Sequence, residues 1–189
     1  NTNSDTEVLY RGLIKEGTKC LQKLNGMFAF GFYDSESNKI LIVRDRYGIK
    51  PVYYYHDESH FIFASEQKAI AKFTGWNPNL SNLSEYAVFK YTSGNKTMIE
   101  KICELEPGHA AEFDVNKGKL RIWRWYDFVE QRTEEKIDYE KLDNIIFQAV
   151  KTHLISDVPL GIQLSGGIDS SILAWYVSKI RKDDVKSFS

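Results

Sequence analysis

The sequence predicts a mixed chain in two parts: an α+β part with aromatic-rich hairpins between helices, followed by the start of an α/β part. Two observations indicate the first part. The hydrophobic spacing changes from helical to strand-like after residue 26, and three polar turns separate pairs of apolar segments. A glycine-rich loop between an apolar strand and an apolar helix near the C-terminus indicates the second part.

The first part is expected to begin with a helix. Ser4 followed three residues later by Glu7 has the spacing of a capping box, and Gly17 ends the apolar stripe that follows. The next expected elements are a helical piece at 20–24, strands at 27–33, 39–44, 52–55 and 61–64, helices at 66–73 and 84–90, and strands at 110–115 and 119–125. These strands are apolar on both faces, so both faces of their sheets are expected to be covered.

A charged stretch at residues 130–136 is the best candidate for a domain boundary. It gives an expected first domain at residues 1–130 and a second at 131–189. The second domain is expected to contain a helix at 139–154, a strand at 158–164, a helix at 172–182 and the start of a strand at 185–188. One and a half strands do not bury a sheet, so the C-terminal end is expected to be a cut, as is a start without Met.

Composition excludes several classes of function. The net charge of −1 provides no field that attracts nucleic acid or anionic membranes. No apolar run approaches the ~20 residues of a membrane span. Two cysteines are too few for a disulfide framework, and we expect them to be thiols in a reducing compartment, the cytoplasm.

The strongest candidate site is a loop made of Leu164, Ser165, Gly166, Gly167, Ile168, Asp169, Ser170 and Ser171. Adjacent glycines allow backbone N–H groups to approach an oxyanion, the serines add hydroxyl donors, and the following helix directs its positive end at the same place. The expected ligand is therefore a phosphate or pyrophosphate. The carboxylate of Asp169 would repel such a ligand unless a cation such as Mg²⁺ lies between them. A helix N-cap is the alternative role for Asp169.

This loop lacks the Gly-Lys-Ser/Thr ending of a Walker loop. It resembles the loop of the N-type ATP pyrophosphatases, which split ATP between its α- and β-phosphates. The loop alone leaves several of these families open, including GMP, NAD and argininosuccinate synthetases and tRNA-modifying ligases. A glycine-rich turn without a ligand is the structural alternative.

Further motifs narrow the resemblance, and they lie in one order along the chain. They are LNGMFAF at residues 24–30, RDRYGIKPVYY at 44–54, FASE at 63–66, LEPGH at 105–109 and SDVPLG at 156–161. Together with the loop, they resemble the glutamine-hydrolysing asparagine synthetases over essentially the whole chain.

The resemblance implies a fold and an activity. The expected fold is part of an N-terminal-nucleophile hydrolase sandwich, with two β-sheets between helices, followed by the start of an adenine-nucleotide α-hydrolase-like α/β domain. The implied reaction uses ATP and Mg²⁺ to convert aspartate into β-aspartyl-AMP, and ammonia from glutamine then displaces AMP to give asparagine. Glutamine, aspartate and ATP are the implied partners, and a homodimer is compatible with the resemblance.

By position, Asp5 matches the carboxylate that holds the α-amino group of glutamine in this family, although a helix-capping role is the alternative. The family's nucleophile, a cysteine directly after the initiator Met, has no match here. By their positions, Cys20 and Cys103 do not replace it, so we expect no catalytic residue in this chain and no activity from the chain alone. The Arg44-Asp45-Arg46 cluster is expected either at an interdomain face or in a surface group of ion pairs.

Two other functions stay open at this stage. A relative with the same two-domain plan could act on another carboxylate, as in β-lactam formation or glycan modification, since the acceptor pocket is not in this sequence. A non-catalytic scaffold module that keeps only a nucleotide loop is the alternative from a different class.

Overall fold

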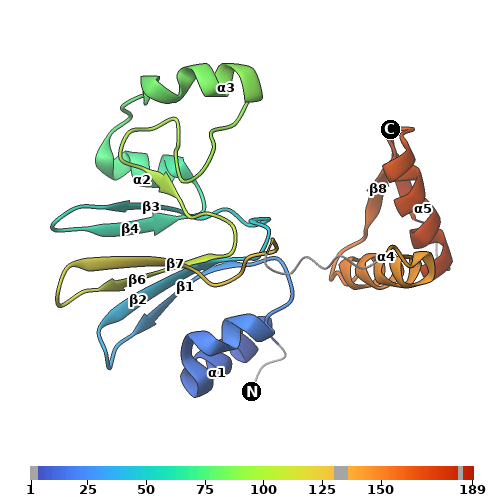
Figure 1. Cartoon of the computed structure of the whole chain (residues 1–189), viewed down its shortest axis with the longest axis horizontal. Helices are drawn as coiled ribbons and strands as arrows, with labels where there is room; N and C mark the ends of the chain where they lie inside the picture. Colours follow the sequence, from blue (N-terminus) through green and yellow to red (C-terminus); the bar gives the residue numbers. More distant parts are fainter. Residues whose placement is uncertain (1–3, 130–135, 183–184) are drawn as a thin grey trace. The chain divides into compact units, whose positions relative to one another are not determined.

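The computed structural model describes residues 4–129, 136–182 and 185–189. The chain divides into two compact units, a first unit at Asn1–Arg132 and a second unit at Thr133–Ser189 (Figure 1). The expected domain boundary between residues 130 and 131 lies outside the described residues. Each unit is considered by itself.

The first unit contains two antiparallel sheets that lie face to face between helices (Figure 1). One sheet has the order β1-β2-β6-β7, formed by Ala29–Asp34, Lys39–Arg44, His109–Asp114 and Lys119–Arg124. The other has the order β4-β3-β5, formed by Phe61–Ala64, Tyr53–His56 and Cys103–Glu104. This arrangement confirms the expected pair of sheets between helices.

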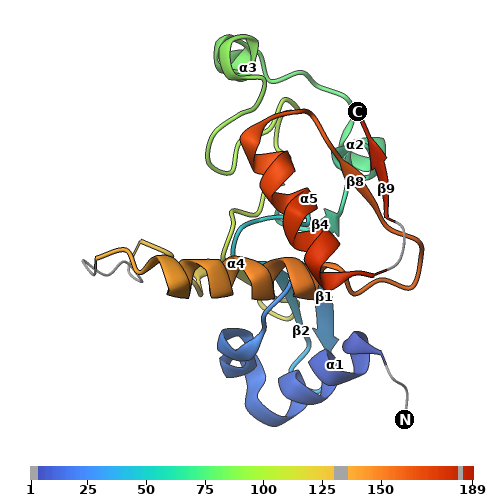
Figure 2. The same cartoon turned by 90° about the vertical axis from the view of Figure 1, so that its right-hand side faces the viewer.

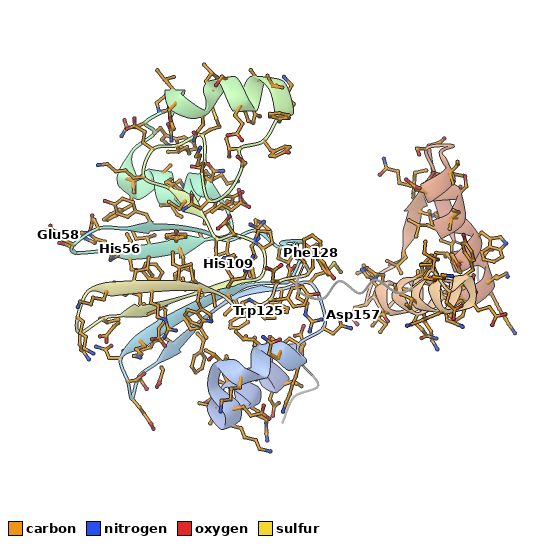
Figure 3. All side chains as sticks on the ribbon, viewed as in Figure 1. His56, Glu58, His109, Trp125, Phe128 and Asp157 are labelled. Atoms are coloured by element: carbon orange, nitrogen blue, oxygen red, sulfur yellow. The ribbon has the colours of Figure 1, made fainter. Side chains whose placement is uncertain are left out.

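Helix α1 at Asp5–Glu16 covers the outer face of the four-stranded sheet, together with the 3₁₀ helix at Gly17–Lys23. The Ser4 side chain caps α1 by accepting from the amide of Thr6 at 3.2 Å, and Gly17 ends the helix with φ +60°, so the predicted cap residue and helix end are confirmed. The Glu7 carboxylate, expected in a capping box with Ser4, pairs with Arg11. Leu13 and Leu21 pack against β2 in a cluster that includes Trp125, which lies on this side of the sheet (Figure 3).

A second cluster joins the two sheets, and a third lies under α2, at Gln67–Thr74. Ile42 of β2 packs with Val52 and Tyr54 between the sheets, while Ile70 of α2 packs on the outer face of the three-stranded sheet with Tyr53 among its neighbours. Since β2 and β3 each contribute side chains to two layers, the prediction that both sheet faces are covered is confirmed.

The long segment between β4 and β5 holds α2, a 3₁₀ turn at Leu80–Asn82 and α3 at Leu83–Phe89. The predicted boundaries of the hairpins and of these helices lie within two residues of the observed ones. Local spacing did not predict the pairing of β2 with β6, in which Ile42 faces Ala111, or the short strand β5 beside β3. Both pairings join segments that are far apart in sequence.

Arg44 and Asp45 are buried within the first unit, so the expectation of a surface group of ion pairs is wrong for these two residues. Arg44 donates to the carbonyl oxygens of Gly48 at 2.9 Å, Lys50 at 3.0 Å and Leu105 at 2.6 Å, and it pairs with Glu104 at 2.7 Å. It therefore ties the end of β2 to the segment around β5. Only Arg46 is partly exposed, with its guanidinium 4.8 Å from the ring centre of Tyr126.

The second unit consists of α4 at Tyr139–His153, β8 at Gly161–Gln163, α5 at Ile168–Ile180 and β9 at Lys186–Phe188. Strands β8 and β9 pair in parallel, with Ile162 opposite Ser187, and α5 packs across one end of α4 (Figure 2). Val150, Tyr176 and Val177 form the buried core of this unit. The predicted strand at 158–164 is shorter than expected, and the predicted helix at 172–182 begins four residues earlier.

Within the described parts of the chain, none of the helices combines the length and the apolar character that crossing a membrane requires.

Candidate functional site

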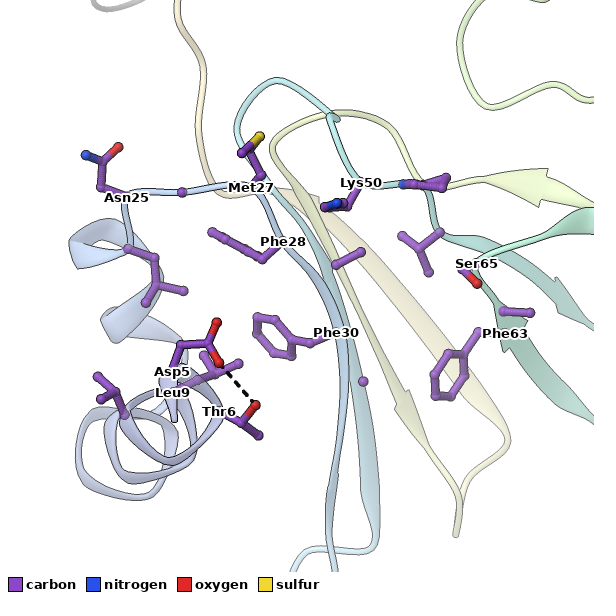
Figure 4. A pocket seen from close by; sticks show the side chains of 18 residues that line it. Asp5, Thr6, Leu9, Asn25, Met27, Phe28, Phe30, Lys50, Phe63 and Ser65 are labelled. Carbon is purple, nitrogen blue, oxygen red and sulfur yellow. Dashed lines mark hydrogen bonds between the residues drawn. The ribbon is translucent and has the colours of Figure 1, made fainter. Parts of the chain in front are cut away.

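A cavity of about 760 Å³ lies in the first unit between α1, the start of β1 and the segments around residues 50 and 64 (Figure 4). Its walls are mostly apolar, with Leu9, Phe28, Phe30 and Phe63 among them. Its polar lining comes from Asp5, Thr6, Asn25, Lys50 and Ser65. This combination of apolar walls and a few polar groups is typical of pockets for small molecules.

Asp5 lines this cavity, as the first residue of α1. Its Oδ1 lies 3.4 Å from the hydroxyl oxygens of Ser4 and Thr6, and its side chain is exposed. Figure 4 places Asp5 on the α1 side of the cavity and Lys50 and Ser65 on the opposite side. A carboxylate in this position is chemically suited to an ammonium group. Ser4, not Asp5, is the N-cap of α1.

The sequence alone assigns no role to Phe28, Lys50 or Ser65, although each lies in one of the motifs that resemble the asparagine synthetases. The signal was present in the motifs at residues 24–30, 44–54 and 63–66. Spacing alone does not show that these three segments meet, because they belong to strands of two different sheets. Tertiary packing brings them together around one cavity.

The second candidate site is the loop of the second unit, between β8 and α5. Leu164 ends the strand by donating from its amide to the carbonyl of Phe188 at 2.7 Å. Gly166 has φ +79°, and no atom lies within 4 Å of the position that a Cβ would take. The loop therefore adopts a left-handed turn that favours glycine, with open space beside it.

The loop is shorter than predicted, since α5 already includes Ile168, Asp169, Ser170 and Ser171. Gly167 is the N-cap, so the alternative N-cap role of Asp169 is wrong; Asp169 lies in the first turn instead. The hydroxyl groups of Ser170 and Ser171 donate to the carbonyl of Gly167 at 3.1 and 2.8 Å, and Ser165 Oγ lies 3.1 Å from Ser170 Oγ.

The helix α5 is thirteen residues long and begins without a side-chain cap. Its first amides therefore do not donate to a capping side chain, and the dipole of the helix favours an anion at this end. The exposed carboxylate of Asp169 is a hard oxygen ligand of the kind that Mg²⁺ prefers. The residues present thus fit an anionic phosphate together with a divalent cation. Among the described residues, no cluster of three or more His, Cys, Asp or Glu forms a metal site of its own.

Neither cysteine is among the residues that line the cavity of the first unit. Cys20 is packed in the core under α1, and Cys103 is half-buried in β5. Burial raises the pKa of each thiol, which disfavours the thiolate at neutral pH.

Comparison with known proteins follows the same division. Residues 1–126 match the family described as a glutamine amidotransferase domain, and residues 141–189 match the family described as asparagine synthase. Glutamine-hydrolyzing asparagine synthetase 3 of Bacillus subtilis is 36% identical over 176 residues, which cover 90% of this chain and 28% of that protein. Glutamine-hydrolyzing asparagine synthetase B of Escherichia coli is 34% identical over 179 residues, which cover 94% of this chain and 28% of that protein.

The chain thus spans less than a third of the length of these two relatives. Among solved structures, glutamine phosphoribosylpyrophosphate amidotransferase from B. subtilis matches with a TM-score of 0.43 and 16% identity, over all of this chain and 39% of that one. The match of residues 1–126 covers most of the chain, so the chain belongs to the glutamine amidotransferase domain family, while residues 141–189 are similar to the asparagine synthase family.

Proposed function

We propose that the protein that contains this chain synthesises asparagine from aspartate, with ATP for activation and glutamine as the source of ammonia. The observation that carries this proposal is the presence of two different sites on one chain. One is a cavity lined by a carboxylate in a glutamine amidotransferase domain, and the other is a phosphate-type loop in asparagine synthase sequence. Two relatives with this organisation are named glutamine-hydrolyzing asparagine synthetases.

The proposed reaction needs both sites. In the first, Asp5 would hold the ammonium group of glutamine while the side-chain amide is hydrolysed to glutamate and ammonia. In the second, an oxygen of the aspartate β-carboxylate attacks the α-phosphorus of ATP and pyrophosphate leaves. Ammonia then attacks the acyl carbon, and AMP departs with the carboxylate oxygen. Activation is required because a carboxylate oxygen is a poor leaving group.

The loop would act at the activation step. The first-turn amides of α5 would donate to phosphate oxygens. The hydroxyl groups of Ser165 and Ser170 bond to each other, and that of Ser170 donates to Gly167, so these hydroxyls would rotate to donate to the phosphate. Asp169 would hold Mg²⁺, which when bound supplies positive charge between the carboxylate and the phosphates. Ser165, Gly167 and Asp169 are exposed, so a phosphate can reach this end of α5.

Replacing Asp5 by Asn tests the first site. The variant keeps the size of the side chain but loses a charge-assisted hydrogen bond worth about 1.5–3 kcal/mol, so glutamine affinity should fall roughly tenfold to a hundredfold. Calorimetric titration of the full gene product with glutamine measures this change. Glu36→Gln removes an equal charge from the exposed β1–β2 turn and should leave the affinity unchanged. Equal affinities for Asp5→Asn and the unmodified protein would reject the role of Asp5.

Replacing Asp169 by Asn tests the second site through the cation. With Mg²⁺ present, ATP affinity should fall about tenfold, since the variant loses one charged ligand. With EDTA instead, the variant should bind ATP at least as well as the unmodified protein, because the repulsion between carboxylate and phosphate is gone.

Glu140→Gln is the matched control for that experiment, because Glu140 lies in the first turn of α4 as Asp169 does in α5. This variant should leave the affinity for ATP unchanged, both with Mg²⁺ and with EDTA. A loss of ATP binding by Asp169→Asn that is the same with Mg²⁺ and with EDTA would contradict the cation role.

The acceptor decides between the proposed reaction and its alternative, an amidotransferase for another carboxylate. ATP–pyrophosphate exchange by the full gene product should depend on aspartate and not on glutamate or on larger carboxylates. Exchange without aspartate, or no ATP binding at all, would overturn the proposal in favour of the alternative or of a scaffold. The proposal includes a location in the cytoplasm, in agreement with two free thiols, and a homodimer is compatible with it.

A further inference from the structure

Asp45 is a fully buried carboxylate at the turn after β2. Its two oxygens accept from four backbone amides. Oδ1 accepts from Tyr47 and Ile49 at 3.1 Å each, while Oδ2 accepts from Phe28 at 3.3 Å and Lys50 at 2.9 Å. None of the ion pairs between the described residues involves Asp45. The charge is therefore balanced by backbone N–H groups.

The main chain of Asp45 strengthens one of these connections. Its amide donates to the carbonyl of Phe28 at 2.9 Å, so Asp45 and Phe28 are joined twice. Its carbonyl accepts from Gly48 at 3.2 Å and from Gly108 at 2.8 Å. The position of Phe28 is thus fixed with respect to the turn after β2.

The two carboxylate oxygens of Asp45 connect different parts of the chain. Oδ1 bonds only within the turn, which a neutral side chain such as Asn could stabilise equally well. Oδ2 joins Phe28, at the start of β1, to Lys50, which follows the turn. Phe28 and Lys50 both line the cavity that contains Asp5, whereas Asp45 itself is not among its lining residues.

A local role in the turn does not account for a charge at this place. Burying a carboxylate is costly unless every oxygen is hydrogen-bonded, and the turn requires only one of the two. The second oxygen is satisfied only because two walls of the cavity approach it. A negative charge at Asp45 is therefore explained if the cavity requires the segments of Phe28 and Lys50 to be held together.

We infer that Asp45 is a positioning residue of the cavity: it sets the distance between the Phe28 wall and the Lys50 wall, and through them the affinity for the amino-acid ligand. The link to a ligand rests on the proposed function. The link to the walls rests only on the contacts of Asp45.

Asp45→Asn separates the role in the turn from the role between the cavity walls. The amide oxygen can still accept from Tyr47 and Ile49, while the NH₂ group does not accept from Phe28 and Lys50. Ile70→Val, on the buried face of α2 and not among the residues that line the cavity, is the control for a general loss of stability. Amide hydrogen exchange by NMR on the 189-residue chain is the first measurement. In Asp45→Asn, the amides of Phe28 and Lys50 should exchange about tenfold faster relative to that of Ile42, and in Ile70→Val the ratio should not change.

Glutamine titration of the full gene product is the second measurement. Asp45→Asn should weaken binding about tenfold at a temperature where it is folded, while Ile70→Val should bind as the unmodified protein does. If the exchange ratio stays unchanged, the inference is overturned whether or not glutamine binds. If the ratio rises but affinity is unchanged, Asp45 holds the walls without affecting the ligand, and the inference is again overturned.

The unmodified protein provides a test even if Asp45→Asn does not fold. The amides of Phe28 and Lys50 should be as strongly protected from exchange as those of Tyr47 and Ile49, because one carboxylate holds all four. Rapid exchange of Phe28 or Lys50 alone would overturn the inference. Absence of glutamine binding by the unmodified gene product would instead reject the proposed function, and the exchange results would still decide the role of Asp45.

Discussion

Replacing Arg44 by Met is expected to lower the free energy of unfolding of the first unit by about 3–5 kcal/mol. The guanidinium is buried, donates to three backbone carbonyl groups and pairs with Glu104 at 2.7 Å. Met fills similar space but leaves Glu104 without this partner and three carbonyl oxygens without this donor. Urea denaturation followed by tryptophan fluorescence measures the change, since Trp125 packs near β2.

Two further variants show whether the fork of the guanidinium or only its charge matters. Arg44→Lys keeps the charge but does not reach three carbonyl groups and a carboxylate, so it should be intermediate in stability. Arg124→Met removes a pair in which Arg124 is about half-exposed, although its partner Asp127 is largely covered, and it should cost about 1 kcal/mol. Similar small losses for Arg44→Met and Arg124→Met would contradict the buried role of Arg44.

Replacing Gly108 by Ala is expected to cost about 2–5 kcal/mol, the sum of about 1–2 for a left-handed conformation and about 1–3 for displaced hydrogen bonds. Gly108 has φ +67°, and an added Cβ would lie 2.5 Å from the carbonyl oxygen of Tyr126. The backbone would have to move, although the amide of Gly108 donates to Asp45 and its carbonyl accepts from Trp125. Thermal unfolding of the variant measures the loss.

Gly118→Ala measures the cost of the left-handed backbone conformation without the steric clash that is expected at residue 108. Gly118 has nearly the same φ, +62°, but the nearest atom to its added Cβ is the carbonyl oxygen of Glu58 at 3.9 Å. This variant should therefore lose only about 1–2 kcal/mol, the cost of the left-handed conformation. Equal losses for the two variants would show that the contact with Tyr126 relaxes freely.

Local sequence signals predicted the elements of the first unit well. Ser4 and Gly17 bound α1 as expected, and the hairpin from β1 to β2 turns at the polar residues between Tyr33 and Lys39. These features depend on neighbouring residues, through capping, left-handed glycine and alternation of apolar side chains.

The start of α5 was predicted four residues too late, for an identifiable reason. The serines and Asp169 are residues that favour turns and caps, so the motif was interpreted as a loop to its end. In the structure, Gly167 takes the cap and the same polar residues lie in the first turn, where Asp169 complements the helix dipole. The first turn of a helix accepts such residues as readily as a loop does.

The sequence by itself determined which residues carry the candidate chemistry: Asp5 at the start of a helix and the Gly166-Gly167 loop before another, together with three pairs of strands. Only the tertiary structure decided that β2 pairs with β6, that Asp5 and Lys50 line one cavity, and that Asp45 bridges Phe28 and Lys50. Caps, turns and alternation act over a few residues, so they can be read along the chain. Burial and the satisfaction of buried polar groups depend on segments brought together by folding, and a charged triplet such as Arg44-Asp45-Arg46 therefore looks like a surface group until its partners are in place.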